Sequence, residues 1–202
     1  MRASITVTLG LALGLGILFG ACDSGNVSSD SGRITVFIKD EPFPFDLVDS
    51  AVVSINRVTL VGDDTTDNYV LLSDIEQTFN LLDLRNGVMD TLATVPIPEG
   101  VYTGLRIVVD DEAYVRLKSG ELFRMKTPSG TTSGIKVHLP TFEIGELGDE
   151  VEVIVDFNVE KSFVLQGNAG TPAGIKGFLF KPVLKAERFE LNGVEPDTTS
   201  ET

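Results

Sequence analysis

The sequence has little of three residue types that often carry chemistry: it holds one cysteine, one histidine and no tryptophan among 202 residues. A single cysteine cannot form a disulfide within the chain, so Cys22 is either an idle thiol or a modified one. A single histidine, His138, cannot supply the usual multi-ligand zinc site. An aromatic platform for sugars would have to use the 12 Phe or 3 Tyr residues.

Basic residues are also scarce. The 16 Lys and Arg residues are outnumbered by 30 Asp and Glu residues, which gives a formal net charge of −14. Such a chain repels phosphate backbones, and nucleic-acid binding needs a basic stripe that the sequence lacks. The composition therefore excludes nucleic acid as a partner, whereas it favours solubility and leaves room for divalent cations.

The first 21 residues are typical of an export signal. Arg2 is followed by an apolar run from Ile5 to Phe19, which is short for a transmembrane helix of about 20 residues. Small residues then precede Cys22, as they precede the cut in signal peptides. Gly20-Ala21-Cys22 resembles a bacterial lipoprotein signal, although Phe19 stands where that signal has Leu.

This resemblance implies cleavage after Ala21 and a lipid anchor on Cys22. Two or more acyl chains hold a protein stably on a membrane. We therefore expect a protein of the bacterial cell envelope, with its domain outside the cytoplasm. A retained helix or ordinary secretion is the alternative. Asp23 resembles a retention signal for the cytoplasmic membrane in enteric bacteria only, so the cytoplasmic and the outer membrane both stay open.

The remaining chain divides into three parts by composition. Residues 22–31 are rich in Ser, Gly, Asn and Asp and are expected to form a flexible tether. Residues 192–202 form an acidic tail that is expected to be disordered. Residues 32–191 lie between them and are expected to fold as one domain.

This domain has the pattern of an all-β protein. Alternating apolar and polar residues predict strands over several segments, most clearly over residues 151–159. A change of phase near Asn56–Arg57 predicts a β-bulge, and Ser119-Gly120 predicts a hairpin turn. Many short strands separated by turn residues predict an antiparallel β-sandwich. The other predicted strands are 33–39, 50–61, 69–72, 101–110, 113–117, 121–126, 135–139 and 177–187.

One segment departs from this pattern. Leu81, Leu84, Val88, Leu92 and Val95 lie near helical spacing and are followed by two prolines. The sequence therefore predicts one or two short helical turns in this segment.

Six short motifs follow one another along residues 32–186. They are residues 36–42 (VFIKDEP), 81–84 (LLDL), 98–107 (PEGVYTGLRI), 128–136 (PSGTTSGIK), 156–162 (DFNVEKS) and 180–183 (FKPV). In this order they resemble a family of unknown function called DUF4382, whose members are often bacterial lipoproteins. The resemblance implies a β-rich domain outside the cytoplasm and supplies no activity. Asn158 stands where the family has a second Asp, which weakens any metal site there.

Acidic residues at strand ends are the candidates for a metal site. Asp40, Asp110, Asp111 and Asp156 carry the carboxylates that calcium needs in numbers. No EF-hand spacing is present, and solvated acids in turns are the simpler interpretation. We therefore expect no cofactor, with calcium as the alternative.

Ligand contacts are expected in the segment between Lys126 and Lys136. Its Gly, Ser and Thr residues fail the phosphate-loop spacing, yet loops often carry binding residues. Ser129 and Lys136 are the candidates there. Arg106 is a third candidate, although it has the same parity as Tyr102 and is expected to anchor a carboxylate inside the sandwich instead.

No catalytic set of residues emerges from the sequence, so we expect a non-enzymatic module that binds an envelope protein or glycan. One alternative is a calcium-stabilised adhesion or glycan-binding module. A second is a carboxylate-based hydrolase, in which two acids would face each other across a cleft. A third is an assembly role through an exposed edge strand. Convergence of Asp40, Asp110, Asp111 and Asp156 in one pocket would favour the first two alternatives.

Overall fold

A computed structural model describes residues 30–40, 46–63, 69–126, 133–145, 147–168, 170 and 174–196. Cys22, Ala21 and Ser129 lie outside the described residues, as does the side chain of Asp111. The elements are β1 (Asp30–Asp40), β2 (Val48–Gly62), β3 (Tyr69–Ser73), β4 (Gln77–Asn80), η1 (Leu81–Leu84), β5 (Asp90–Pro98), β6 (Gly100–Leu117), β7 (Leu122–Lys126), β8 (Ile135–Ile144), β9 (Asp149–Phe157), α1 (Val159–Ser162), β10 (Phe163–Gly167), β11 (Ile175–Phe180) and β12 (Leu184–Leu191).

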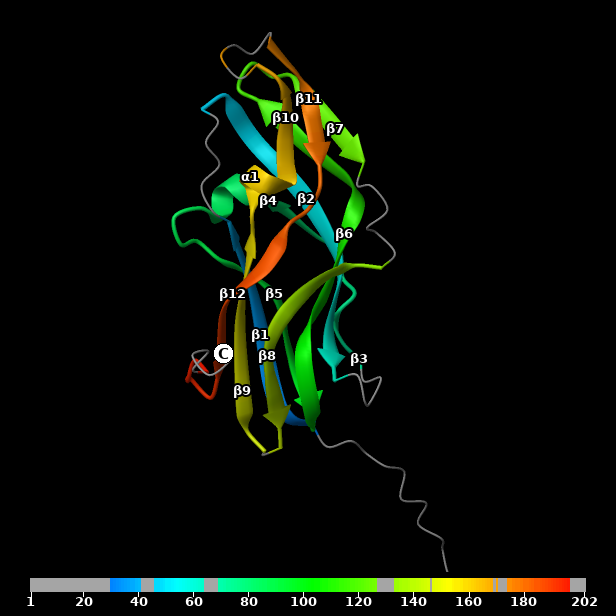
Figure 1. The fold of residues 1–202 in the computed structure, drawn as a ribbon, viewed down its shortest axis with the longest axis vertical. Coiled ribbons are helices and arrows are strands. Elements are labelled where there is room, and N and C mark those ends of the chain that lie inside the picture. Colours follow the sequence, from blue (N-terminus) through cyan, green and yellow to red (C-terminus); the bar gives the residue numbers. More distant parts are fainter. Residues whose placement is uncertain are drawn as a thin grey trace, which may run out of the picture.

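Two long antiparallel strands, β2 and β6, run along most of the molecule (Figure 1). Each is paired by different strands in its two halves. Strand β2 pairs with β3 and β4, whereas β6 pairs with β8 and β7. These six strands form one sheet, and its outer face in the β3-β2-β6-β8 half is the surface that matters below.

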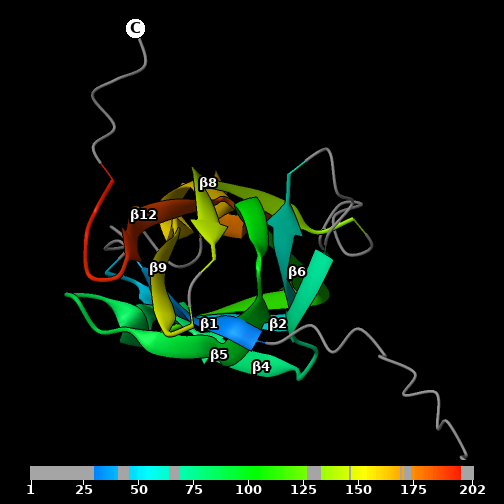
Figure 2. The same ribbon diagram turned by 90° about the horizontal axis from the view of Figure 1, so that it is seen from below.

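A second sheet, ordered β12-β9-β1-β5, covers the inner face of that half. Figure 2 shows the strands of the two sheets enclosing the space between them. Branched side chains fill this space, including the fully buried Ile34, Val36, Val153 and Ile107. The β10–β11 ribbon extends the other end of the molecule beside β7, where Phe123 and Phe178 make an edge-on ring contact.

The prediction of an all-β sandwich is confirmed, and its sheets are mainly antiparallel. One pair, β1 with β9, is parallel. The predicted bulge near Asn56 is confirmed because Ile55 and Arg57 pair with the consecutive residues Val109 and Val108. The hairpin at Ser119-Gly120 is also confirmed, since β6 and β7 pair on either side of it.

The helical prediction for residues 81–95 is correct only in its first part. Leu81–Leu84 form the 3-10 turn η1, but residues 90–98 form strand β5. Among the described strands, β5 pairs only with β1, so it lies at a sheet edge, where proline removes no ladder hydrogen bond. Pro96 and Pro98 are therefore compatible with a strand, and the helical spacing of Leu92 and Val95 was coincidental.

Two strand boundaries also differ from the sequence prediction. Strand β9 ends at Phe157, because Asn158 caps the single turn of α1 through Lys161 N. The predicted strand 177–187 is two strands, which residues 181–183 separate. Contacts of the domain continue past Leu191, since Asn192 Oδ1 accepts a hydrogen bond from the Glu150 amide at 2.8 Å.

Candidate functional site

The structure does not bring together the three candidate metal ligands whose side chains it describes, Asp40, Asp110 and Asp156. Asp156 lies on β9 and Asp40 at the end of β1, with their side chains on opposite faces of one sheet. Asp110 belongs to the other sheet, in a bulge of β6 opposite Ser54. Within the described ranges, no cluster of three acidic, His or Cys side chains could hold a metal ion. Scattered acids count against both a calcium site and a two-carboxylate hydrolase.

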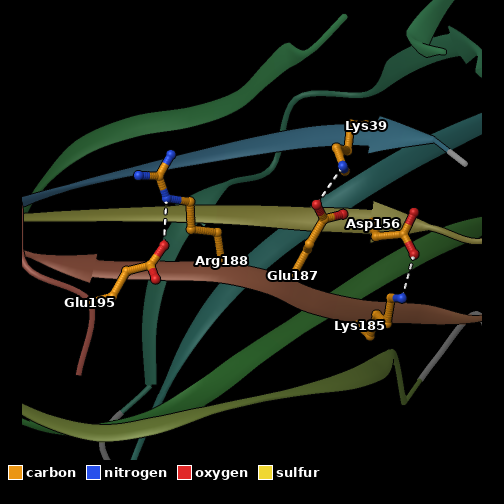
Figure 3. A network of polar contacts seen from close by, with 6 residues as sticks. All are labelled: Lys39, Asp156, Lys185, Glu187, Arg188 and Glu195. Carbon is orange, nitrogen blue, oxygen red and sulfur yellow. Dashed lines mark hydrogen bonds and ion pairs between the residues drawn. The ribbon is translucent and has the colours of Figure 1, made fainter. Parts of the chain in front are cut away.

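Asp156 instead belongs to a row of alternating charges across three strands (Figure 3). Its side chain is fully buried, and Lys39 and Lys185 are its cross-strand partners on either side. Lys185 Nζ lies 3.3 Å from Asp156 Oδ2, while Lys39 pairs with Glu187. A buried carboxylate between two lysines is neutralised locally, which points to a structural role.

A second buried polar group closes the turn around α1. The Val159 amide donates to Asp40 Oδ1 at 3.3 Å, and the Val183 amide donates to Ser162 Oγ at 2.9 Å. Asn158 Oδ1 accepts from the Lys161 amide at 2.9 Å. These bonds hold the point where the chain leaves one sheet for the β10–β11 ribbon. The motifs at 156–162 and 180–183 therefore build a chain junction, in which the buried Ser162 hydroxyl accepts a hydrogen bond from the Val183 amide.

The candidate ligand residues Arg106 and Lys136 do come together. They are direct cross-strand partners on β6 and β8, and both lie on the outer face of the sheet. Here they border a hollow of about 360 Å³, which we call the cationic hollow. Its rim and floor are formed by Tyr69, Thr103, Gly104, Arg106, Lys136 and His138.

Gly104 forms the floor of the cationic hollow. It pairs with Val61 on one side and His138 on the other, so it lies in the centre of the row. A methyl group at this position would lie 2.7 Å from the Val137 carbonyl oxygen. Strand β8 therefore approaches β6 so closely that only glycine fits, and the missing side chain leaves space between Val61 and His138.

Arg106 is held in place from two sides. Its Nη1 donates to the Ser133 carbonyl at 3.0 Å, and its guanidinium carbon lies 5.7 Å from the centre of the Tyr69 ring. Gly134 permits this course, because its φ of +67° suits glycine and a methyl group there would lie 2.7 Å from Arg106 Cγ. The guanidinium is thus positioned before any ligand arrives.

This placement corrects the prediction that Arg106 shares a face with Tyr102 and anchors a carboxylate inside the sandwich. Tyr102 is fully buried against Phe142, and its hydroxyl donates to the Pro98 carbonyl at 2.9 Å. Thr103 is an extra residue opposite β2, where Val61 pairs with Gly104 and Gly62 pairs with Tyr102. That bulge reverses the parity of the strand, so Arg106 faces outward.

The electrostatics of the cationic hollow oppose those of the whole chain. None of the described residues that line it is acidic, although the chain carries a net charge of −14. Within the described part of the chain, neither Arg106 nor Lys136 forms an ion pair with a carboxylate. Like charges directly opposite each other on two strands destabilise the pair, and a bound anion would relieve this repulsion.

Sequence reasoning missed Tyr69 and Gly104 as parts of this site. Tyr69 had only been assigned to a short strand, and its side chain is about half exposed at 54%. A glycine inside the predicted strand 101–110 was the available signal, since such a glycine often marks a close approach. His138 is exposed on β8, as is Lys136 two residues before it.

His138 also borders a second hollow of about 340 Å³ between β8 and β12. Arg188 and Glu195 line that hollow and pair with each other at 2.8 Å. Figure 3 shows this pair on and beyond β12. Glu195 and the neighbouring Glu190 raise the pKa of Arg188 further above its ordinary value. The second hollow thus holds a cation that is already neutralised, unlike the first.

By its fold, this protein belongs to the class of all-β sandwiches, and it carries a small cationic hollow on the outside of one sheet. Residues 31–182 match the family model described as a domain of unknown function, DUF4382, and the chain belongs to that family. The search of curated proteins found no match. Over the residues that the structure describes, no helix is long and apolar enough to cross a membrane.

Proposed function

We propose that this chain is a lipid-anchored protein of the bacterial cell envelope whose β-sandwich binds an envelope component without catalysing a reaction. The observation that carries the binding role is the cationic hollow. Its volume of about 360 Å³ lies in the range of small-ligand sites, and its polar groups converge on one space. The anchor rests on the sequence around Cys22.

The positions of the polar groups support binding over catalysis. Arg106, Lys136 and His138 provide hydrogen-bond donors on the outer face of β6 and β8. The buried polar side chains, such as Ser162 and Asp156, are engaged in the chain junction and the charge row. Covalent catalysis needs a nucleophile and a base within reach of each other. The Ser162 hydroxyl accepts a hydrogen bond from the Val183 amide in the chain junction instead.

The binding role can be tested with insoluble fragments of the cell envelope. We would mix them with the full chain in mild detergent and measure the fraction that sediments. Lys136→Glu should lose most of this binding, because it places a carboxylate at the rim of the hollow. Lys176→Glu is the matched control, since Lys176 is also an exposed strand lysine but lies on β11. Equal sedimentation of the two variants would contradict the proposed site.

The anchor can be tested separately by metabolic labelling with a fatty-acid analogue. The full chain should incorporate the label and fractionate with membranes, whereas Cys22→Ala should do neither. Label in neither protein, with the N-terminal segment still attached, would refute the lipid anchor. That result would leave the binding test unaffected, because the two tests concern different parts of the chain.

A further inference from the structure

We infer that the cationic hollow binds a saccharide that carries carboxylates, with the carboxylate at Arg106 and Lys136 and the sugar ring beside Tyr69. The inference rests on the proposed binding function and adds the chemical class of the ligand. It follows from the charge of the site, from the way Arg106 is fixed, and from the shape of the floor.

Charge comes first. Arg106 and Lys136 face each other across β6 and β8, and His138 is two residues further along β8. A carboxylate between the first two would accept charge-assisted hydrogen bonds from both, which are stronger than neutral ones. A neutral ligand would leave the repulsion between the two cations in place. The hollow therefore favours an anion.

The guanidinium of Arg106 is held in one orientation. The Ser133 carbonyl and the Tyr69 ring hold the guanidinium of Arg106, so little side-chain freedom is lost when an anion binds. A planar guanidinium in a fixed position matches the two oxygens of a carboxylate. The site is thus preorganised for a carboxylate rather than only attractive to negative charge.

Shape comes third. A bare anion would fill only a small part of about 360 Å³, whereas a sugar ring with its substituents would fill much more. The ring can lie over Gly104, where no side chain intervenes between Val61 and His138. Tyr69 is exposed and offers an aromatic edge. His138 offers a hydrogen bond to a sugar hydroxyl group, and Thr103 Oγ1, which donates to the Gly62 carbonyl, can accept one. Mixed polar and aromatic walls of this kind suit a saccharide.

The net charge of the chain limits the ligand further. At −14 overall, the domain repels long polyanions except where they touch the hollow. Nucleic acids present a phosphate at every residue, so most of their charges would face acidic surface. A short stretch of acidic sugar places one carboxylate in the site and neutral hydroxyl groups beside it.

The test is a calorimetric titration of the full chain in mild detergent with three probes. These are a hexuronic-acid trimer, the uncharged hexose trimer of the same linkage, and inorganic phosphate. We expect the hexuronic-acid trimer to bind at least about 10-fold more tightly than either other probe. Lys136→Gln should weaken its binding about 10-fold, or about 1.4 kcal/mol. The matched control Lys176→Gln should leave the binding unchanged.

A second variant separates the sugar from the anion. Tyr69→Ser should weaken the hexuronic-acid trimer by a larger factor than phosphate, because both ligands lose the support that the ring gives to Arg106 but only the sugar also loses its own contact with the ring. Equal binding of the neutral trimer would overturn the role of the anion. Equal binding of phosphate would reduce the hollow to a general anion site. If envelope fragments bind through Lys136 but no saccharide does, the ligand class is wrong and the binding function stands.

Discussion

Gly104→Ala tests the close approach of β6 and β8 that creates the cationic hollow. The new methyl group would lie 2.7 Å from the Val137 carbonyl oxygen, and ordinary contact begins at 3.4 Å. The strands would therefore have to separate by about 0.7 Å. Both atoms belong to or adjoin backbone, so no flexible side chain can move aside to absorb the strain.

The magnitude follows from two opposing effects. Overpacking of this kind costs about 1–3 kcal/mol. Replacing glycine by alanine restricts the unfolded chain, which offsets about 0.4–1 kcal/mol of that cost. We therefore expect the free energy of unfolding to fall by about 1–2 kcal/mol. At about 2–4 °C per kcal/mol for a domain of this size, Tm should fall by about 2–8 °C.

Gly145→Ala is the matched control for this experiment. A methyl group at Gly145 would meet no atom within 4 Å, and its backbone is not in the left-handed region. Urea unfolding of the full chain should show Gly145→Ala equal to the wild type or slightly more stable. If Gly104→Ala unfolds at the same urea concentration as Gly145→Ala, the strands are further apart than described and the floor of the hollow is misplaced.

Three further predictions concern single contacts. Burial raises the pKa of the Tyr102 hydroxyl above 10.0, so this tyrosine ionises at a lower pH in the unfolded state than in the folded state. The free energy of unfolding should therefore fall as pH rises past about 10, and Tyr102→Phe should abolish this fall in unfolding experiments. Ser162→Ala should lower the free energy of unfolding by about 1–2 kcal/mol, because the Val183 amide loses its acceptor. Gly134→Ala should displace Arg106 and weaken calorimetric binding of the hexuronic-acid trimer. No change in any of these three measurements would contradict the corresponding contact.

Local patterns were sufficient to predict most strands, because a half-buried strand alternates along its length. The segment from Val151 shows this, as does the hairpin at Ser119-Gly120. Alternation fails where a bulge inserts a residue, and it failed at Thr103 in the middle of β6. The error moved Arg106 from the outer face to the interior. The bulge at Asn56 was predictable because the parity of apolar residues changes visibly there.

Non-local pairing was beyond the sequence. Arg106 and Lys136 were each candidates, but their proximity depends on the register of β6 with β8. Tyr69 joins them only because β3 pairs with β2 at Val61. The parallel pairing of β1 with β9 and the edge position of β5 likewise depend on contacts between distant segments. No single-sequence pattern contains this information.

Hydrogen–deuterium exchange of the full chain, with and without envelope fragments, tests the central claim most directly. Amides on the strands around the cationic hollow should be protected when the fragments bind, in particular those of residues 69–73, 101–107 and 135–139. Residues 175–180 of β11 lie at the other end of the molecule and should exchange unchanged (Figure 1). Protection confined to β11 or to the sheet containing β9 would place the binding surface elsewhere and contradict the account.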